Sequence, residues 1–197
     1  MLWSVCFAAY CYENMLAVCF FVSIKRLRSF ILGKKELLVD PSCYDLNKPL
    51  VGIEEIRKFN KQRFDMEQLT AVVYENSADV ACVGYKDITK DEFWISGHMP
   101  GYALMPGVIM CEVAAQLASY YSLSNKLMDE STTMGFAGLD KVRFRGMVRP
   151  GDRLVMQTKM ITLRKILITA RFLGLVNDEI VCEGIIKGVP LQLDIEI

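Results

Sequence analysis

One run of residues decides the fold: Gly97-His-Met-Pro-Gly-Tyr-Ala-Leu-Met-Pro-Gly-Val-Ile-Met-Cys-Glu-Val-Ala-Ala-Gln116. The Pro-Gly pair at its centre predicts the start of a helix, because proline pre-sets the first turn and lacks the N–H that would stay unpaired there. The predicted helix, from Gly107 to about Met128, is apolar on nearly every side. Such a helix is usually buried, so we expect a sheet to wrap around it.

The same run brings together three groups that can do chemistry. His98 is the only histidine in the 197 residues, and imidazole titrates near neutral pH. The helix start at Gly107 supplies unpaired backbone N–H groups and the positive end of the helix dipole. Glu112 follows inside the apolar helix, where burial favours a protonated carboxyl group. A base, an anion-binding helix end and an acid together predict a catalytic site.

Each of these residues also has a purely structural interpretation. A lone histidine in a loop is usually just solvated. Glu112 could form an ion pair at an interface, and Gly107 could serve helix packing alone. The packing role of Gly107 does not exclude a catalytic role for its N–H group.

Composition excludes several function classes. Basic and acidic residues number 23 each, so the formal net charge is zero and nothing suggests a nucleic-acid partner. Seven cysteines are scattered without a CxxC pair, and one histidine cannot complete a cysteine–histidine zinc site, so no metal is expected. The plain interpretation is reduced thiols in a cytoplasmic protein, several of them packed as small hydrophobic side chains.

Residues 1–35 form a hydrophobic extension that allows two interpretations. Met1 to Ile24 is almost wholly apolar, and the basic run Lys25-Arg-Leu-Arg28 follows. Glu13 lies in the middle and costs about 2.5 to 3.5 kcal/mol on insertion, against a gain of about 4 kcal/mol from the apolar side chains. The extension is therefore either a weak membrane anchor, which makes a membrane-anchored location the alternative, or an artefact of the start site.

The remaining residues, 36–197, predict a single domain. Residues 37–49 carry two prolines and little periodicity, which predicts an extended arm. Apolar residues at helical spacing predict a short helix over Ile53–Phe59. Two strand-like runs, 69–74 and 80–85, flank a predicted hairpin turn at 76–79.

The C-terminal third predicts further strands. Asn177-Asp178 predicts a two-residue hairpin turn, because both residue types tolerate positive φ. In the predicted strand around residues 154–160, apolar residues on one face alternate with Val155, Gln157 and Lys159 on the opposite face. One long helix and five to six mostly antiparallel strands make an α+β domain.

The opening run resembles the signature of the hotdog-fold β-hydroxyacyl-acyl-carrier-protein dehydratases of fatty acid synthesis. A second block, Phe136 to Arg145 followed by Val148-Arg-Pro-Gly-Asp152, resembles the same family in order and distance. The resemblance covers roughly residues 57 to 188. It implies a long central helix wrapped by a curled antiparallel sheet, the order of elements predicted above.

The resemblance implies a lyase that removes water from a β-hydroxyacyl thioester to give the trans-2-enoyl thioester. It implies no cofactor, because the phosphopantetheine arm arrives with the acyl carrier substrate. His98 would be the base, Glu112 the acid that assists departure of the hydroxyl, and the Gly107 N–H a donor to the enolate oxygen. Gln116, one turn after Glu112, could hydrogen-bond it and fix its orientation. In the family one site takes its histidine and its acid from different subunits, which implies at least a homodimer.

Some residues depart from the family pattern. Lys61-Gln-Arg63 and Glu67-Gln-Leu-Thr70 stand where many members have a Pro-His-Arg segment and a Leu-Leu-Val-Asp strand. Gly135 falls where some members carry a tyrosine that gates the acyl tunnel. Chain length and carrier therefore stay open. Glutamate at position 112 favours the dehydratase-only branch, because members that also isomerise the double bond have aspartate there.

Five basic residues recur in the second block. Their plain interpretation is a solvated strand face, and the functional one is a docking patch for the acidic acyl carrier protein. They are Lys141, Arg143, Arg145, Arg149 and Arg153. Two rival functions stay open: another hotdog acyl-thioester enzyme, such as a thioesterase or CoA-linked hydratase, or a non-catalytic acyl-binding or membrane-scaffold protein.

Overall fold

A computed structural model describes residues 36–129, 132–164 and 166–192. The predicted hydrophobic extension, residues 1–35, lies outside the described residues. Among the helices in the described ranges, none is long and apolar enough to cross a membrane.

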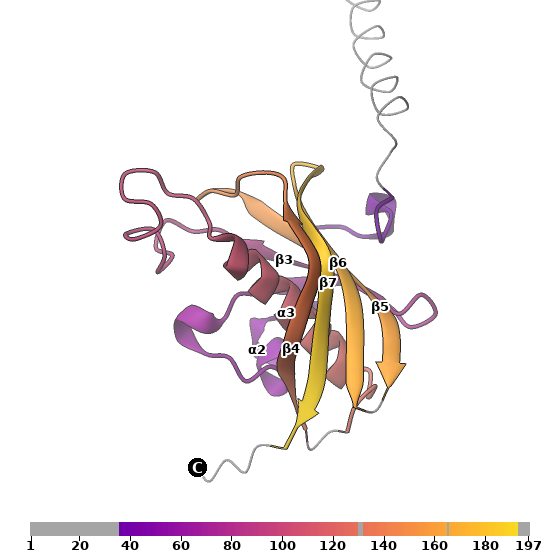
Figure 1. Ribbon diagram of the computed structural model, residues 1–197. Coiled ribbons are helices and arrows are strands. Elements are labelled where there is room, and N and C mark those ends of the chain that lie inside the picture. The colour runs from indigo at the N-terminus through magenta and orange to yellow at the C-terminus, as the bar shows by residue number, and fades with distance from the viewer. Residues whose placement is uncertain (1–35, 130–131, 165, 193–197) are drawn as a thin grey trace, which may run out of the picture. The chain divides into compact units, whose positions relative to one another are not determined.

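The described residues form a curled, wholly antiparallel sheet around one long helix (Figure 1). The sheet has seven strands in the order β1-β2-β3-β5-β6-β7-β4, against the five to six expected. The additional strand, β1, is two residues long and pairs with β2. The strands are β1 (Val51–Gly52), β2 (Ala71–Asn76), β3 (Ala81–Asp87), β4 (Thr133–Phe144), β5 (Arg153–Arg164), β6 (Leu167–Val176) and β7 (Glu179–Leu191).

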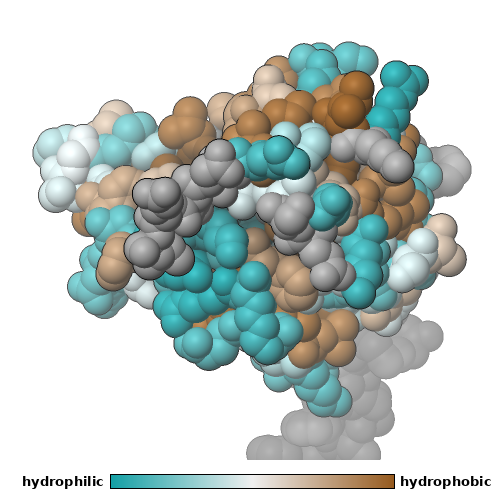
Figure 2. Space-filling model, turned by 90° about the horizontal axis from the view of Figure 1, so that it is seen from below, coloured by the Kyte–Doolittle hydropathy of each residue, from teal (hydrophilic) through white to brown (hydrophobic). Residues whose placement is uncertain are grey.

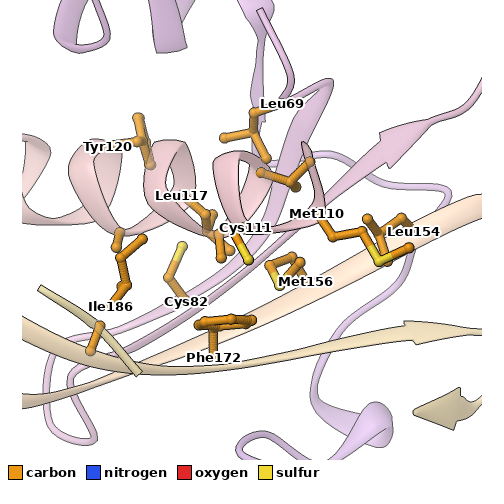
Figure 3. Packing of buried hydrophobic residues seen from close by; sticks show 14 of the residues in the cluster. Leu69, Cys82, Met110, Cys111, Leu117, Tyr120, Leu154, Met156, Phe172 and Ile186 are labelled. Carbon is orange, nitrogen blue, oxygen red and sulfur yellow. The ribbon is translucent and has the colours of Figure 1, made fainter. Parts of the chain in front are cut away.

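Helix α3 (Gly107–Ser124) is the central element, and it is buried on nearly all sides as the sequence predicts. In Figure 3, Cys111 and Leu117 of α3 point toward Met156 and Phe172 of the sheet. Leu117 and Phe172 are both fully buried. The shorter helix α2 (Ile53–Phe59), also predicted, lies beside α3, and its Phe59 ring meets Tyr120 edge-on at 5.6 Å between centroids.

The end of α3 differs from the prediction, since the helix stops at Ser124 and not near Met128. After the capping Asn125, Lys126 adopts a positive φ of 54°. Its N–H donates to Leu123 O, and the next N–H, of Leu127, donates to Ser122 O. These two bonds form a Schellman motif, which ends a helix by satisfying its last carbonyls. The left-handed position at the end of a helix is usually glycine. Here it is Lys126, so the residue type does not indicate where the helix ends.

Both predicted hairpin turns are confirmed. The Asn76 side chain accepts hydrogen bonds from the N–H groups of Ala78 (2.8 Å) and Asp79 (3.1 Å), which closes the turn between β2 and β3. Asn177 and Asp178 have φ of 50° and 65° and connect β6 to β7.

Three cysteines pack in the core as small hydrophobic side chains, as expected. Cys82, Cys111 and Cys182 are buried free thiols. Burial raises the pKa of Cys111 to about 11 and that of Cys182 to about 12. These thiols therefore stay protonated near neutral pH, in the unreactive form.

The sheet has a second buried face, which the alternating sequence pattern did not reveal. The predicted arm, residues 37–49, includes a short 3-10 helix, η1 (Pro41–Cys43), and covers the face opposite α3. Beneath it Gln157 is fully buried. Its Oε1 accepts the N–H groups of Leu38 (3.0 Å) and Val39 (3.1 Å), and its Nε2 donates to Val39 O at 2.8 Å. Gln157 therefore holds the arm on the sheet.

We expect Gln157→Leu to lower the free energy of unfolding by about 1–3 kcal/mol, because it leaves the buried N–H groups of the arm without an acceptor. Urea unfolding measures the change. The control is Lys159→Ala, two residues further along the same face, which should stay within about 0.5 kcal/mol of the parent. Equal stabilities for Gln157→Leu and the parent would contradict this role of Gln157.

Candidate active site

His98 lies on a long segment between β3 and α3. Residues Ile88 to Pro106 contain neither helix nor strand, and they project beside the start of α3 (Figure 1). The backbone N–H of His98 donates to Trp94 O at 2.8 Å. Trp94 is only 3% exposed, so this bond ties the exposed histidine to the core.

The imidazole of His98 is oriented by one backbone oxygen. Its Nδ1 lies 2.9 Å from Leu104 O. A carbonyl oxygen only accepts hydrogen bonds, so Nδ1 carries the hydrogen and the neutral ring keeps its lone pair on Nε2. This arrangement suits a general base that acts through Nε2.

Gly107 starts α3 as predicted, with Pro106 as the capping residue. A Cβ atom at Gly107 would lie 2.6 Å from Cζ of Phe144, so a larger residue would require the exposed Phe144 ring to move. Close packing against Phe144 is consistent with a packing role for Gly107. Its N–H stays available in principle, because the first N–H groups of a helix have no acceptor within the helix.

Glu112 is held in place by Gln116, one turn later on α3. Gln116 Nε2 donates to Glu112 Oε1 at 2.8 Å, so the two side chains make the contact that their spacing allows. The same Nε2 donates to Met66 O (2.6 Å), and Gln116 Oε1 accepts the Gln68 N–H (2.8 Å). The Asn60 side chain donates to the Gln116 carbonyl at 2.9 Å. Gln116 is 2% exposed, so this amide is fixed from several sides.

A cavity of about 130 Å³ opens beside Glu112, between α3 and the sheet. This volume equals roughly four waters at ~30 Å³ each, which is room for a short alkyl segment. Seven of the thirteen lining residues have apolar side chains, and polar and apolar surface contribute about equally to the wall. The lining residues are Gln62, Glu112, Ala115, Ala118, Ser119, Met134, Gly135, Phe136, Ile168, Ala170, Ile186, Lys187 and Gly188.

Within one chain, His98 is not among the described residues that line this cavity. Glu112 and Gln116 lie on α3 beside the cavity, Gly107 is the first residue of α3, and His98 lies on the segment that precedes it.

The five basic residues do not form one patch. Arg145 pairs with Glu183 (2.6 Å), and Arg153 pairs with Asp87 (2.6 Å) at the start of β5. Arg149 stacks on Tyr102, 4.7 Å from the ring centroid, beside the His98 segment. Lys141 and Arg143 lie on β4, and β6 and β7 separate that strand from β5 in the sheet.

Sequence reasoning missed the residues that fix Gln116. Asn60 contributes its side-chain amide, Met66 its carbonyl oxygen and Gln68 its backbone N–H. The last two fall in or beside Glu67-Gln-Leu-Thr70, a segment that departs from the family pattern. Backbone contributions leave no signal in residue type, so this contact could not be predicted.

Comparison with known proteins identifies the family. The family described as FabA-like domain matches residues 60–185. The chain belongs to this family. Its relatives include the 3-hydroxyacyl-acyl-carrier-protein dehydratase FabZ of Clostridioides difficile, 38% identical over 68% of this chain and 94% of the relative. The same enzyme of Hydrogenobaculum sp. is 32% identical over 73% of this chain and 97% of the relative.

Solved structures show the fold. The dehydratase heterocomplex ApeI:P from Xenorhabdus doucetiae matches with a TM-score of 0.59 at 14% identity, over 69% of this chain and 90% of that chain. At this identity the likeness concerns the fold alone. It confirms the α+β hotdog fold expected for this member of the FabA-like family.

We expect Gln116→Leu to lower the free energy of unfolding by about 1–3 kcal/mol, because Met66 O and the Gln68 N–H lose their buried partner. Ser122→Ala is the matched control: Ser122 is also a buried polar residue of α3, but its hydroxyl donates only to Ala118 O of the same helix. Its substitution should cost clearly less. Urea unfolding of both variants measures the difference. An equal loss of unfolding free energy in the two variants would contradict the role of Gln116 in holding Met66 and Gln68.

Proposed function

We propose that this chain dehydrates 3-hydroxyacyl thioesters of acyl carrier protein to trans-2-enoyl thioesters in fatty acid synthesis. The observation that carries the proposal is the oriented acid Glu112 on the wall of a cavity with a partly apolar lining, in a chain that belongs to the FabA-like family. The apolar side chains of the wall suit an acyl chain, and the acid suits the hydroxyl on the third carbon.

The proposed reaction begins with removal of a proton from the second carbon. His98 Nε2 takes this proton, and the Gly107 N–H stabilises the negative charge that develops on the thioester oxygen. One such donor is typically worth about 3–4 kcal/mol in the transition state. Glu112 then protonates the departing hydroxyl, so that the carbon–oxygen bond breaks and water leaves.

The protons taken up and released in this reaction balance without a resident cofactor. His98 ends with one proton more and Glu112 with one fewer, and transfer between them through water restores the starting state. The elimination moves no net electrons to or from the substrate. We expect the phosphopantetheine arm to arrive with the substrate.

We propose a homodimer, because His98 does not line the cavity beside Glu112 within one chain. Strand β4 forms an edge of the sheet in the described residues, and large apolar side chains on it and near it are exposed. Exposed sheet edges and apolar patches typically mark interfaces, and hydrophobic surface also shows between polar side chains in Figure 2. The exposed side chains are Val108, Phe136, Leu139, Phe144 and Met147. A second chain would bring its own His98 toward Glu112.

We propose the acyl carrier protein as the partner, with a docking surface smaller than the sequence suggests. Arg145 and Arg153 already pair with carboxylates. Lys141 and Arg143 on β4, with Arg149 beside the His98 segment, are the better candidates for steering an acidic partner. The cytoplasmic location and membrane association through residues 1–35 stay predictions.

We expect His98→Ala and Glu112→Gln each to reduce turnover by at least about 100-fold while the protein stays folded, because each removes a proton-transfer group. The assay follows the ultraviolet absorbance of the enoyl thioester. Glu179→Gln, an exposed acid at the start of β7, is the control and should keep full activity. Near-normal turnover of His98→Ala would overturn the mechanism, and release of free thiol would indicate a thioesterase.

The shared site has its own test in mixed dimers of two inactive variants. When His98→Ala and Glu112→Gln chains are unfolded and refolded together, each mixed dimer regains one intact site of its two. Statistical mixing makes half of the dimers mixed, so activity should return to about a quarter of the parent's. Each variant refolded alone is the control. No recovery in a verified mixed dimer would mean that each site is built from one chain.

A further inference from the structure

The segment that carries His98, residues 88–106, contains neither helix nor strand, so other contacts must hold it in place. Such long segments in a compact domain are uncommon and usually functional. Its first residue, Ile88, donates to Asp152 O at 2.9 Å, and near its last residue Met105 donates to Val148 O at 2.9 Å. These two bonds fix the ends and leave the middle, where His98 lies, to be held by other contacts.

A buried ion pair holds the segment between those ends. Lys86 is the penultimate residue of β3, and its Nζ lies 3.0 Å from Glu92 Oε1. The two side chains are 8% and 7% exposed. The same oxygen accepts the Thr89 N–H at 3.3 Å. Burying two charges costs much of what their attraction returns, so apolar side chains of similar size would stabilise the fold at least as well. Stability alone therefore does not account for this pair.

The pair is connected to His98 by a short chain of contacts. Glu92 O accepts the Ile95 N–H at 3.0 Å, which closes a turn around the buried Trp94. Trp94 O in turn accepts the His98 N–H at 2.8 Å. A shift of Glu92 would carry this turn with it and move the imidazole relative to Leu104 O.

We propose that Lys86 and Glu92 are positioning residues for His98. An apolar contact has no preferred direction, whereas an ion pair with an additional backbone hydrogen bond holds Glu92 in one place. The pair thereby sets the loop geometry in which His98 Nδ1 meets Leu104 O and Nε2 acts as the base. This inference rests on the role of His98 in the proposed function.

The test replaces both charges at once in the full chain. In Lys86→Met/Glu92→Leu no unpaired charge stays buried, so the melting temperature should equal or exceed the parent's. We expect kcat to fall at least about 10-fold with KM within about threefold, because the pair acts on the base and not on substrate binding. Glu92→Gln is the second variant; it keeps the side chain's shape and an acceptor for Thr89 and should lose kcat in the same direction.

A second measurement reads the imidazole directly. Because His98 is the only histidine, labelling with ¹⁵N-histidine gives one pair of ring signals, provided that any purification tag lacks histidine. The parent should show the tautomer protonated on Nδ1. The double variant should show a mixture of tautomers, because the bond to Leu104 O is no longer enforced.

Two controls separate positioning from general disturbance. Lys58→Met/Glu55→Leu removes an exposed pair of the same residue types on α2 and should change neither kcat nor the His98 signals. Lys86→Arg keeps the positive charge and should retain most of the parent's kcat.

The outcomes distinguish this inference from the proposed function. Unchanged His98 signals in the double variant overturn the positioning role, whether or not kcat falls. A changed tautomer with lower kcat supports it. A changed tautomer with full turnover supports the positioning role and shows that His98 is not the base.

Discussion

Enclosure of α3 is the constraint on which the rest of the structure depends. The helix is apolar on nearly every side, so it is stable in water only when other elements cover it all round. The sheet curls around it for this reason, and the segments between strands must also pack against it. Any polar group on such a helix needs a partner from those segments, because an unpaired buried group costs about 1–3 kcal/mol.

Gln116 shows how this requirement builds a site. Its amide is buried and therefore needs partners, which come from the backbone of the segment before β2 and from Glu112. The contacts that satisfy the core thus also orient a carboxyl group at the wall of a cavity. Small side chains at Ala115 and Ala118 leave that cavity open. The orientation of the Glu112 carboxyl group therefore follows from the hydrogen bonds that the core requires.

The histidine half of the site follows a different rule. His98 lies outside regular structure, so its position depends on individual contacts and not on a repeating pattern of hydrogen bonds. A buried ion pair, a buried tryptophan and one carbonyl oxygen hold it. In the proposed dimer the two halves come from different chains, so the exposed apolar side chains on and near β4 bear on the chemistry as well as on assembly.

Local signals predicted the elements well where a residue type has one physical meaning. Pro106-Gly107 marked the start of α3, and Asn177-Asp178 marked the tight turn, because proline fixes φ and asparagine and aspartate tolerate positive φ. The end of α3 was wrong, since Lys126 takes the left-handed conformation that glycine usually signals. The spacing of the five basic residues could not show that Arg145 and Arg153 pair with carboxylates on other strands, because those partners are distant in sequence.

The sequence by itself determined the buried helix, the antiparallel strands, the family and the residues that can act as acid and base, because these depend on residue type and spacing along the chain. Only the tertiary structure decided that Gln157 is buried beneath an arm, that Gln116 bridges three segments and that Lys86 meets Glu92. The contacts of Gln157 and Gln116 join residues that are distant in sequence and involve backbone atoms that every residue has. Lys86 and Glu92 are only six residues apart, but they meet only because the segment after β3 folds back on that strand. No pattern of residue types specifies such a partner until the chain has folded.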